Sequence, residues 1–200
     1  IPDIFDNITD KLEKPVISTA KHMIGFADTY NAPVGLSKNP AVLPIRSEGN
    51  EVFFAYDGEW TKGKMHGYGK YLYDDGFTCI GSFRNNWQEG ECTAVYPNGD
   101  KYEGNWHKGR FHDKGTLTTA GGSIYYGEFR HGIRHGHGRI DHPSGLSYEG
   151  HWANGVPQGH GIMKSKSSQY SYEGDFEKGS IKGTGTLITP KGERIIRLWT

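Results

Sequence analysis

The feature of this sequence that most restricts its fold is an internal repeat. Glycines at the centre of a recurring Tyr-x-Gly-x-Trp/Phe pattern follow one another at spacings of 23, 23, 23, 23 and 24 residues. These are Gly58, Gly81, Gly104, Gly127, Gly150 and Gly174. The second copy is the weakest, because it carries Cys79 where the others carry Tyr. A period of this length indicates one supersecondary unit per copy, packed only against its neighbours.

Further columns of the repeat agree with this alignment. A second glycine stands five positions downstream, at Gly63, Gly109, Gly132, Gly155 and Gly179. A His-Gly-x-Gly motif or a variant of it follows, as in His66-Gly67-Tyr68-Gly69. A turn glycine comes last in five of the six copies, at Gly76, Gly99, Gly122, Gly145 and Gly192, whereas near Ser168 this column and the spacing both slip by an extra residue. Agreement in this many columns excludes a chance match.

The pattern predicts one β-hairpin per repeat. Tyr, Gly and Trp or Phe stand at i, i+2 and i+4, so they face one side of a strand, and carboxylates such as Glu59 and Glu149 face water. We expect a loop of about six residues to lead into the second strand. Gly58 should then lie opposite Gly69 and leave room for tyrosine rings to lie across the sheet. The predicted fold is all-β, a single-layer twisted antiparallel meander of about six hairpins.

Composition is consistent with a thin sheet. Leu, Ile, Val and Phe make up 38 of the 200 residues, too few for a thick aliphatic core, whereas Gly alone contributes 30. Lys plus Arg and Asp plus Glu number 23 each, so the chain lacks the net charge typical of disorder and the basic excess typical of nucleic-acid binding. No stretch approaches the roughly 20 apolar residues of a membrane span.

The chain divides at about residue 50. Residues 1–50 hold five of the nine prolines but only three of the 30 glycines. Apolar residues at helical spacing in 3–14 and 16–27 predict helices, followed by an extended stretch. We therefore expect residues 1–50 to form a helical and extended arm and residues 51–200 to form the repeat domain. The arm either packs on the chain's own sheet or docks on a partner.

Residues 52–200 resemble the MORN (membrane occupation and recognition nexus) repeat family, with six repeats and a remnant, Ile195-Ile196-Arg197-Leu198-Trp199. The resemblance implies an intracellular scaffold in a cytoskeletal, ciliary or organelle-membrane assembly. MORN repeats also accompany catalytic domains, but residues 1–50 are too short to form one, so we expect no enzyme activity, no cofactor and no small-molecule substrate. The expected partners are other protein subunits.

Two kinds of binding site are predicted. An aromatic stripe that one sheet cannot cover favours a partner's amphipathic helix or extended peptide, unless residues 1–50 fill it and leave the outer face for partners. Its residues are Tyr56, Trp60, Tyr102, Trp106, Tyr125, Phe129, Tyr148, Trp152, Tyr172 and Phe176. The alternative function is peripheral binding to membrane phospholipids, with Arg130, Arg134 and Arg139 as the contacts to anionic headgroups.

Other chemistry is not favoured by the pattern. His135 stands in the same repeat column as His66 and His112, so we interpret it as a surface or turn residue and predict no metal site. Cys79 and Cys92 fall in one hairpin and on one face, but diagonally. Because a disulfide needs Cα atoms within about 7 Å, we interpret the two cysteines as small side chains in a thin groove.

Overall fold

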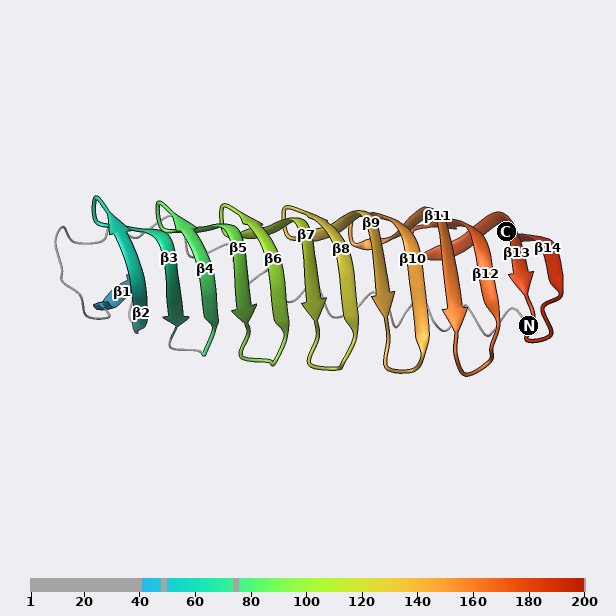
Figure 1. The fold of residues 1–200 in the computed structure, drawn as a ribbon, viewed down its shortest axis with the longest axis horizontal. Coiled ribbons are helices and arrows are strands. Elements are labelled where there is room, and N and C mark those ends of the chain that lie inside the picture. Colours follow the sequence, from blue (N-terminus) through green and yellow to red (C-terminus); the bar gives the residue numbers. More distant parts are fainter. Residues whose placement is uncertain (1–40, 48–49, 74–75, 200) are drawn as a thin grey trace.

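The computed structural model describes residues 41–47, 50–73 and 76–199, so the helices expected within residues 3–27 lie outside the described part. Every regular element in these ranges is a β-strand. Fourteen strands form one antiparallel sheet in which spatial order follows sequence order (Figure 1). The prediction of an all-β, single-layer meander is confirmed.

Six hairpins account for twelve of the strands. They are β2 (Asn50–Thr61) with β3 (Lys64–Tyr73), β4 (Thr78–Arg84) with β5 (Trp87–Val95), β6 (Lys101–His107) with β7 (Arg110–Thr118), β8 (Ile124–Arg130) with β9 (Ile133–Asp141), β10 (Leu146–Ala153) with β11 (Val156–Ser165), and β12 (Ser171–Glu177) with β13 (Ser180–Ile188). Each hairpin corresponds to one sequence repeat. The sheet therefore grows by two strands per repeat.

One further strand lies at each end of the sheet. β14 (Arg194–Trp199) follows the last hairpin and contains the predicted remnant. β1 (Ala41–Ser47) precedes the first hairpin and pairs with β2 from Ala41 opposite Tyr56 to Ser47 opposite Asn50. Within the described residues the sheet therefore begins at residue 41, inside the segment predicted to form an arm.

The hairpin turns are shorter than predicted. Only two residues separate the strands of each hairpin, for example Lys62 and Gly63, or Asn154 and Gly155. Both residues of these turns have positive φ, the conformation of a type I′ turn, whose twist matches that of the flanking strands. The expected six-residue loop is therefore wrong. The His-Gly-x-Gly motif belongs to the second strand, opposite an irregularity in register between Gly58 and Trp60.

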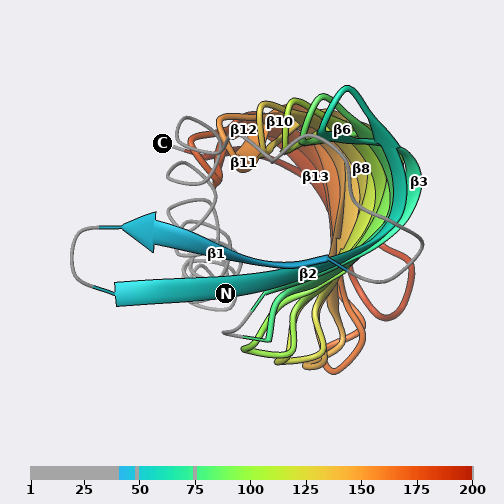
Figure 2. The ribbon, with the colours of Figure 1, turned by 90° about the vertical axis from the view of Figure 1, so that its left-hand side faces the viewer.

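The strands of the sheet are strongly curved along their length (Figure 2). Seen end-on, the stacked hairpins form an open trough, with the β1–β2 hairpin extending beyond it (Figure 2). One face carries the tyrosines, tryptophans and phenylalanines of the repeat together with Leu117, Ile140, Met163 and Leu187, all of these four buried. We call this the aromatic face and the opposite one the outer face. The aromatic face is the core of the molecule.

Tyrosine rings packed over paired glycines form the repeating unit of that core. Gly58 pairs with Gly69 and Tyr56 with Tyr71, as predicted. In the fifth repeat, Gly150 pairs with Gly161, and a Cβ atom on Gly161 would come within 2.5 Å of the Tyr148 hydroxyl. Every repeat tyrosine donates its hydroxyl proton to the carbonyl three residues later, at 2.9 Å for Tyr148 to His151. The ring thus lies flat across the backbone.

Tryptophans join one repeat to the next. The Trp152 indole N–H donates to the Gly138 carbonyl of the preceding repeat at 2.9 Å. Its ring meets Tyr125 of that repeat and Tyr148 of its own edge to face, with centroids 5.1 and 5.3 Å apart. Edge-to-face pairs at this spacing stabilise a fold by roughly 0.5–1.5 kcal/mol beyond their buried area. The core is therefore continuous along the sheet from one repeat to the next.

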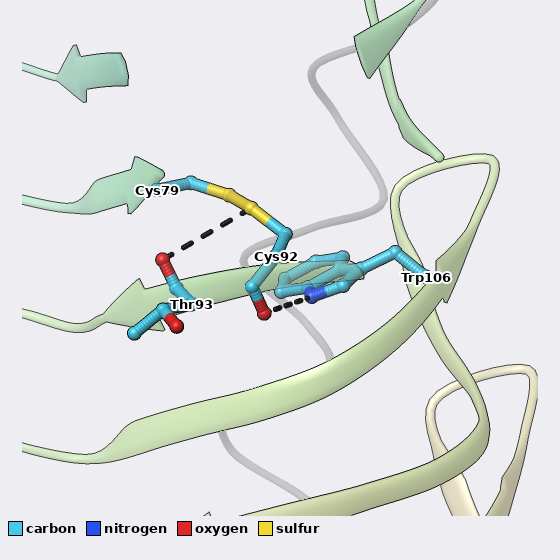
Figure 3. Close-up of a disulfide and its surroundings, with 4 residues drawn as sticks. All are labelled: Cys79, Cys92, Thr93 and Trp106. Atoms are coloured by element: carbon cyan, nitrogen blue, oxygen red, sulfur yellow. Dashed lines mark hydrogen bonds between the residues drawn. A yellow bond between two sulfur atoms is a disulfide. The ribbon is translucent and has the colours of Figure 1, made fainter. Parts of the chain in front are cut away.

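The two cysteines form a disulfide, which corrects the interpretation of them as separate small side chains (Figure 3). Cys79 on β4 pairs with Ala94 and Cys92 on β5 pairs with Gly81, so the cysteines are diagonal neighbours with Cα atoms 6.5 Å apart. This separation lies within the usual disulfide range. Gly81 has no side chain between them, and the second repeat, which lacks the tyrosine, is crosslinked at that place.

The contacts of the glycines predict unequal effects of alanine substitutions. Gly161→Ala should destabilise the protein by roughly 2–3 kcal/mol, because its methyl group would overlap Tyr148. Gly183→Ala is the matched control. It meets nothing within 4 Å and has φ +74, so only its backbone strain counts, about 1 kcal/mol. Urea unfolding of both variants measures the difference. Equal losses would contradict the packing role of the glycine.

Buried tyrosines predict a loss of stability in alkali. Burial raises the pKa of Tyr56 and Tyr172 to about 12, with nearby carboxylates adding to the rise, and it also raises the pKa of Tyr102, Tyr125 and Tyr148. An unfolded chain ionises tyrosine near pH 10. The stabilisation is therefore complete below about pH 10 and is lost as the pH rises towards about 12.

Urea unfolding at increasing pH, with tyrosinate absorbance recorded in parallel, tests this prediction. The absorbance of the buried tyrosines should rise together with the loss of β-sheet circular dichroism. Ionisation of all the tyrosines while the sheet stays intact would contradict it.

Candidate interaction surfaces

The residues predicted to line a partner-binding groove lie together on the aromatic face, but they form the core. Nine of the ten are no more than 3% exposed, namely Tyr56, Tyr102, Trp106, Tyr125, Phe129, Tyr148, Trp152, Tyr172 and Phe176. Trp60 is half-buried. Half-buried hydrophobic residues such as Tyr71, Ile181 and Trp199 pack against this core. A partner on this face would first meet the half-buried residues.

The three arginines predicted to contact lipid do not converge. Arg134 is buried on the aromatic face, with its guanidinium carbon 4.4 Å from the centroid of the Trp152 ring. Arg139 lies on the outer face and binds Asp141 through two hydrogen bonds of 2.8 and 2.9 Å. Arg130 is exposed at the end of β8. Because Arg134 is buried and Arg139 is paired with a carboxylate, the three arginines do not form an exposed basic cluster.

Exposed apolar side chains gather on the outer face near the N-terminal end of the sheet. Tyr68, Leu72, Ile80 and Val95 are between 40% and 64% exposed. They come from three adjacent strands, β3, β4 and β5. Leu72 pairs with Thr78, which pairs with Val95, and Ile80 lies in the next row. We call these four residues the outer patch.

A second exposed apolar pair lies on the same face further along the sheet. Ile124 is 44% exposed and Tyr126 is 62% exposed, both on β8. Their neighbours in register on β7 are Thr118 and Thr116. Between this pair and the outer patch, β6 carries the Lys101–Glu103 ion pair at 3.0 Å.

The hairpin turns form a rim in which each turn from the second repeat onward binds the preceding repeat. The second turn residue donates its N–H to a backbone carbonyl there, as Gly109 does to Gln88 at 3.1 Å. In three of the turns, the first turn residue also donates to a side chain from the His column of the preceding repeat's motif. Lys108 donates to Glu89 at 2.9 Å and Lys178 to Gln158 at 3.0 Å. The sequence analysis interprets this column as a turn or surface position, whereas Glu89, His112 and Gln158 each supply a hydrogen-bond acceptor from it.

Histidines follow the same rim. His107 binds the Glu89 carboxylate at 2.9 Å, and the rings of His107, His112 and His131 follow one another with centroids 5.4 Å apart. In the ranges that the structure describes, no group of three or more His, Cys, Asp or Glu side chains is arranged to hold a metal ion. The same ranges contain no helix that is long and apolar enough to cross a membrane.

A one-layer sheet of stacked hairpins, with an aromatic core on one face, defines a β-repeat protein. The MORN repeat family matches the chain at residues 56–78, 79–101, 102–124, 125–147, 148–169 and 172–194. These matches cover most of the sequence, and the chain belongs to the MORN repeat family. MORN repeats are in general a non-catalytic module, and their occurrence here supports a protein-interaction scaffold.

Among solved structures, the chain is similar to the TCP domain of SAS-4 (dCPAP) of Drosophila Melanogaster, determined in complex with a proline rich motif of Ana2 (dSTIL). The two sequences are 12% identical. The match covers 85% of this chain and 97% of that one, with a TM-score of 0.47.

The rim predicts a small acid-sensitive contribution from Glu89. Burial acts to raise its pKa, but the hydrogen bonds from Lys108 and His107 and the positive charges nearby outweigh it and lower the pKa. The stabilisation is present above the pKa of the unfolded chain, about 4.3, and is lost as the pH falls through the lower folded value.

Glu89→Gln keeps an acceptor oxygen and removes the charge. It should be less stable than the wild type by roughly 0.5 kcal/mol at neutral pH and equally stable at about pH 3. The matched control is Glu91→Gln, an exposed carboxylate on the same strand. Urea unfolding across this pH range measures both variants, and a gap that persists in acid would contradict the assignment.

Proposed function

We propose that this chain is a non-catalytic scaffold that binds another protein through the outer face of its MORN sheet. The observation that carries this proposal is the outer patch, Tyr68, Leu72, Ile80 and Val95, which is exposed while the residues of the aromatic face are buried. Contiguous exposed apolar side chains usually mark sites of protein interaction. The bent, continuous sheet holds these side chains in fixed positions, so little ordering is needed when a partner binds.

The chemistry of the outer patch favours a partner with an apolar surface and a polar border. Thr78 and Thr93 lie between the apolar residues, Lys70 lies between Tyr68 and Leu72 opposite Ile80, and Glu103 borders them in register. The patch therefore offers apolar area around one ammonium group, with a carboxylate at its border. Such a surface suits a strand or helix face with a central apolar row.

The aromatic face is the second candidate surface for a helix or peptide. The half-buried residues Trp60, Tyr71 and Ile181 lie against its core and favour it. Large parts of its rings are already engaged within the sheet, so a partner would gain less apolar area there. Removing a core ring to test this surface would also disturb the fold, as for Trp106 or Trp152.

Peripheral binding to phospholipids remains an alternative that rests on the family resemblance alone, because Arg134 is buried and Arg139 is paired. An intracellular assembly, at the cytoskeleton, a cilium or an organelle membrane, likewise stays a prediction. Disulfides such as Cys79–Cys92 are uncommon in reducing compartments.

The outer patch is tested by charge substitution in the full chain. The variant Leu72→Lys, Ile80→Lys, Val95→Lys should reduce recovery of the partner from cells at least tenfold in quantitative affinity capture. The matched control, Ser147→Lys, Ser171→Lys, Thr186→Lys, adds the same charge elsewhere on the outer face and should keep the partner. Circular dichroism melting verifies that both variants are folded.

Other outcomes decide against the proposal. Equal loss in both triple variants would mean that added charge alone prevents binding. Retention in the patch variant with loss in Trp60→Ala would move the site to the aromatic face. Co-sedimentation of the wild type with phosphatidylserine vesicles at physiological salt, without recovery of any protein partner, would favour the lipid alternative.

A further inference from the structure

The hairpin turns of the first four repeats carry a concentration of positive charge. The four-residue segments at these turns, 61–64, 84–87, 107–110 and 130–133, contain six Lys or Arg residues and no Asp or Glu. The six are Lys62, Lys64, Arg84, Lys108, Arg110 and Arg130. The corresponding segments of the last two repeats, 153–156 and 177–180, hold one lysine and one glutamate. Because the whole chain has 23 residues of each charge, the excess is a local feature of the rim.

The six basic side chains of these turns are accessible to a partner. All six are exposed, and none of them takes part in an ion pair within the ranges that the structure describes. Glu89, a carboxylate of the rim, is half-buried and already binds the Lys108 N–H and the His107 ring. Within the described ranges, the rim therefore keeps most of its positive charge.

The arginines of the rim lie on one side of the sheet. Arg84, Arg110 and Arg130 each stand next to a buried phenylalanine of the aromatic face, so they belong to the outer face. They come from three successive hairpins whose turns follow one another (Figure 2). Backbone hydrogen bonds join these turns, as between the Gly132 N–H and the Phe111 carbonyl at 2.8 Å. The cations are therefore held in a row rather than scattered.

Carboxylates border this row on the outer face. Glu59 and Glu128 lie two residues inside the ends of β2 and β8. Each accepts a backbone N–H, Glu59 from Tyr68 at 2.9 Å and Glu128 from His137 at 3.0 Å. These bonds hold two negative charges close to the cations. A broad anionic surface laid on this side would meet both signs of charge, whereas a chain one residue wide follows the cations alone.

From this we infer that the hairpin-turn rim of the first four repeats binds an acidic, extended segment of a partner protein. Successive turns are about 10 Å apart, because each repeat adds two strands, and an extended chain rises about 3.3 Å per residue. A carboxylate at every third residue therefore meets one turn after another, and guanidinium groups bind carboxylates through paired N–H groups. The rim is separate from the outer patch, so this inference does not rest on the proposed function.

A nucleic acid fits the same rim less well. Proteins that bind single strands combine a basic groove with aromatic rings on which the bases stack. Trp87 is the one Phe, Tyr or Trp residue of the four turn segments. Its ring is half-buried and packs over Gly109 of the next repeat, where an added Cβ atom would lie 3.0 Å from it. The rim thus offers charge without a stacking platform.

Fluorescence anisotropy of labelled synthetic peptides tests this inference on the full chain. The probe is Glu-Ser-Gly repeated four times, and the control peptide has the same composition with its four glutamates contiguous. At low ionic strength the wild type should bind the probe with a dissociation constant on the order of 100 µM. The control peptide should bind at least threefold more weakly, and about 0.5 M salt should abolish both interactions by screening. Equal affinity for the two peptides, or no binding at about 1 mM probe, would overturn the inference.

Charge removal locates the binding site. The variant Arg84→Gln, Arg110→Gln, Arg130→Gln should raise the dissociation constant of the probe at least tenfold. The matched control, Lys164→Gln, Lys166→Gln, Lys191→Gln, removes the same charge from exposed lysines outside the rim and should change it less than twofold. Circular dichroism melting verifies that both variants are folded.

Two outcomes would contradict the assignment of the rim. Equal weakening by both triple variants would show that net charge alone attracts the peptide. Phosphatidylserine vesicles or an oligothymidylate that bind more tightly than the probe, and lose binding in the arginine variant, would assign the rim to a lipid surface or to a nucleic acid instead.

Discussion

The fold depends on one contact, a tyrosine ring lying over a pair of facing glycines. Among the residues that the structure describes, no second layer covers the apolar face of the sheet, so the side chains of that face cover one another and the backbone. Glycine pairs such as Gly150 and Gly161 leave the space, and the Tyr148 hydroxyl anchors the ring at the carbonyl of His151. Trp152 then links this unit to the one before it. Glycine, costly in most strands, is the residue that makes this core possible.

The sequence was sufficient to predict the sheet, its register and its core face, because glycine and aromatic residues recur with a fixed period. It did not predict backbone conformations and hydrogen bonds that are supplied by different residue types in different repeats. The left-handed conformation of Gly136 is also taken by Asp113, with φ 49, which no composition rule distinguishes from an ordinary strand position. The acceptors on the rim vary between Glu89 and Gln158 for the same reason.

The prediction of an open aromatic groove was incomplete because burial depends on curvature. A flat sheet would leave the rings exposed, and the pattern i, i+2, i+4 contains no information on bending. Likewise, the diagonal distance between Cys79 and Cys92 depends on local twist and on the empty space at Gly81. The exposed apolar residues of the outer face follow no repeat column. The surfaces that distinguish this chain from other MORN proteins therefore lie at positions whose residue type the repeat does not specify.

The stacking of the turns has a geometric consequence. Because every hairpin is bound to the preceding one at its strands, its rings and its rim, the distance between features on the outer face is set by counting strands. Ile80 on β4 and Tyr126 on β8 are four strands apart, which corresponds to roughly 19 Å. Equivalent positions in successive repeats are therefore held at a fixed spacing of about 10 Å. A partner that contacts both places is selected by its own length as well as by its chemistry.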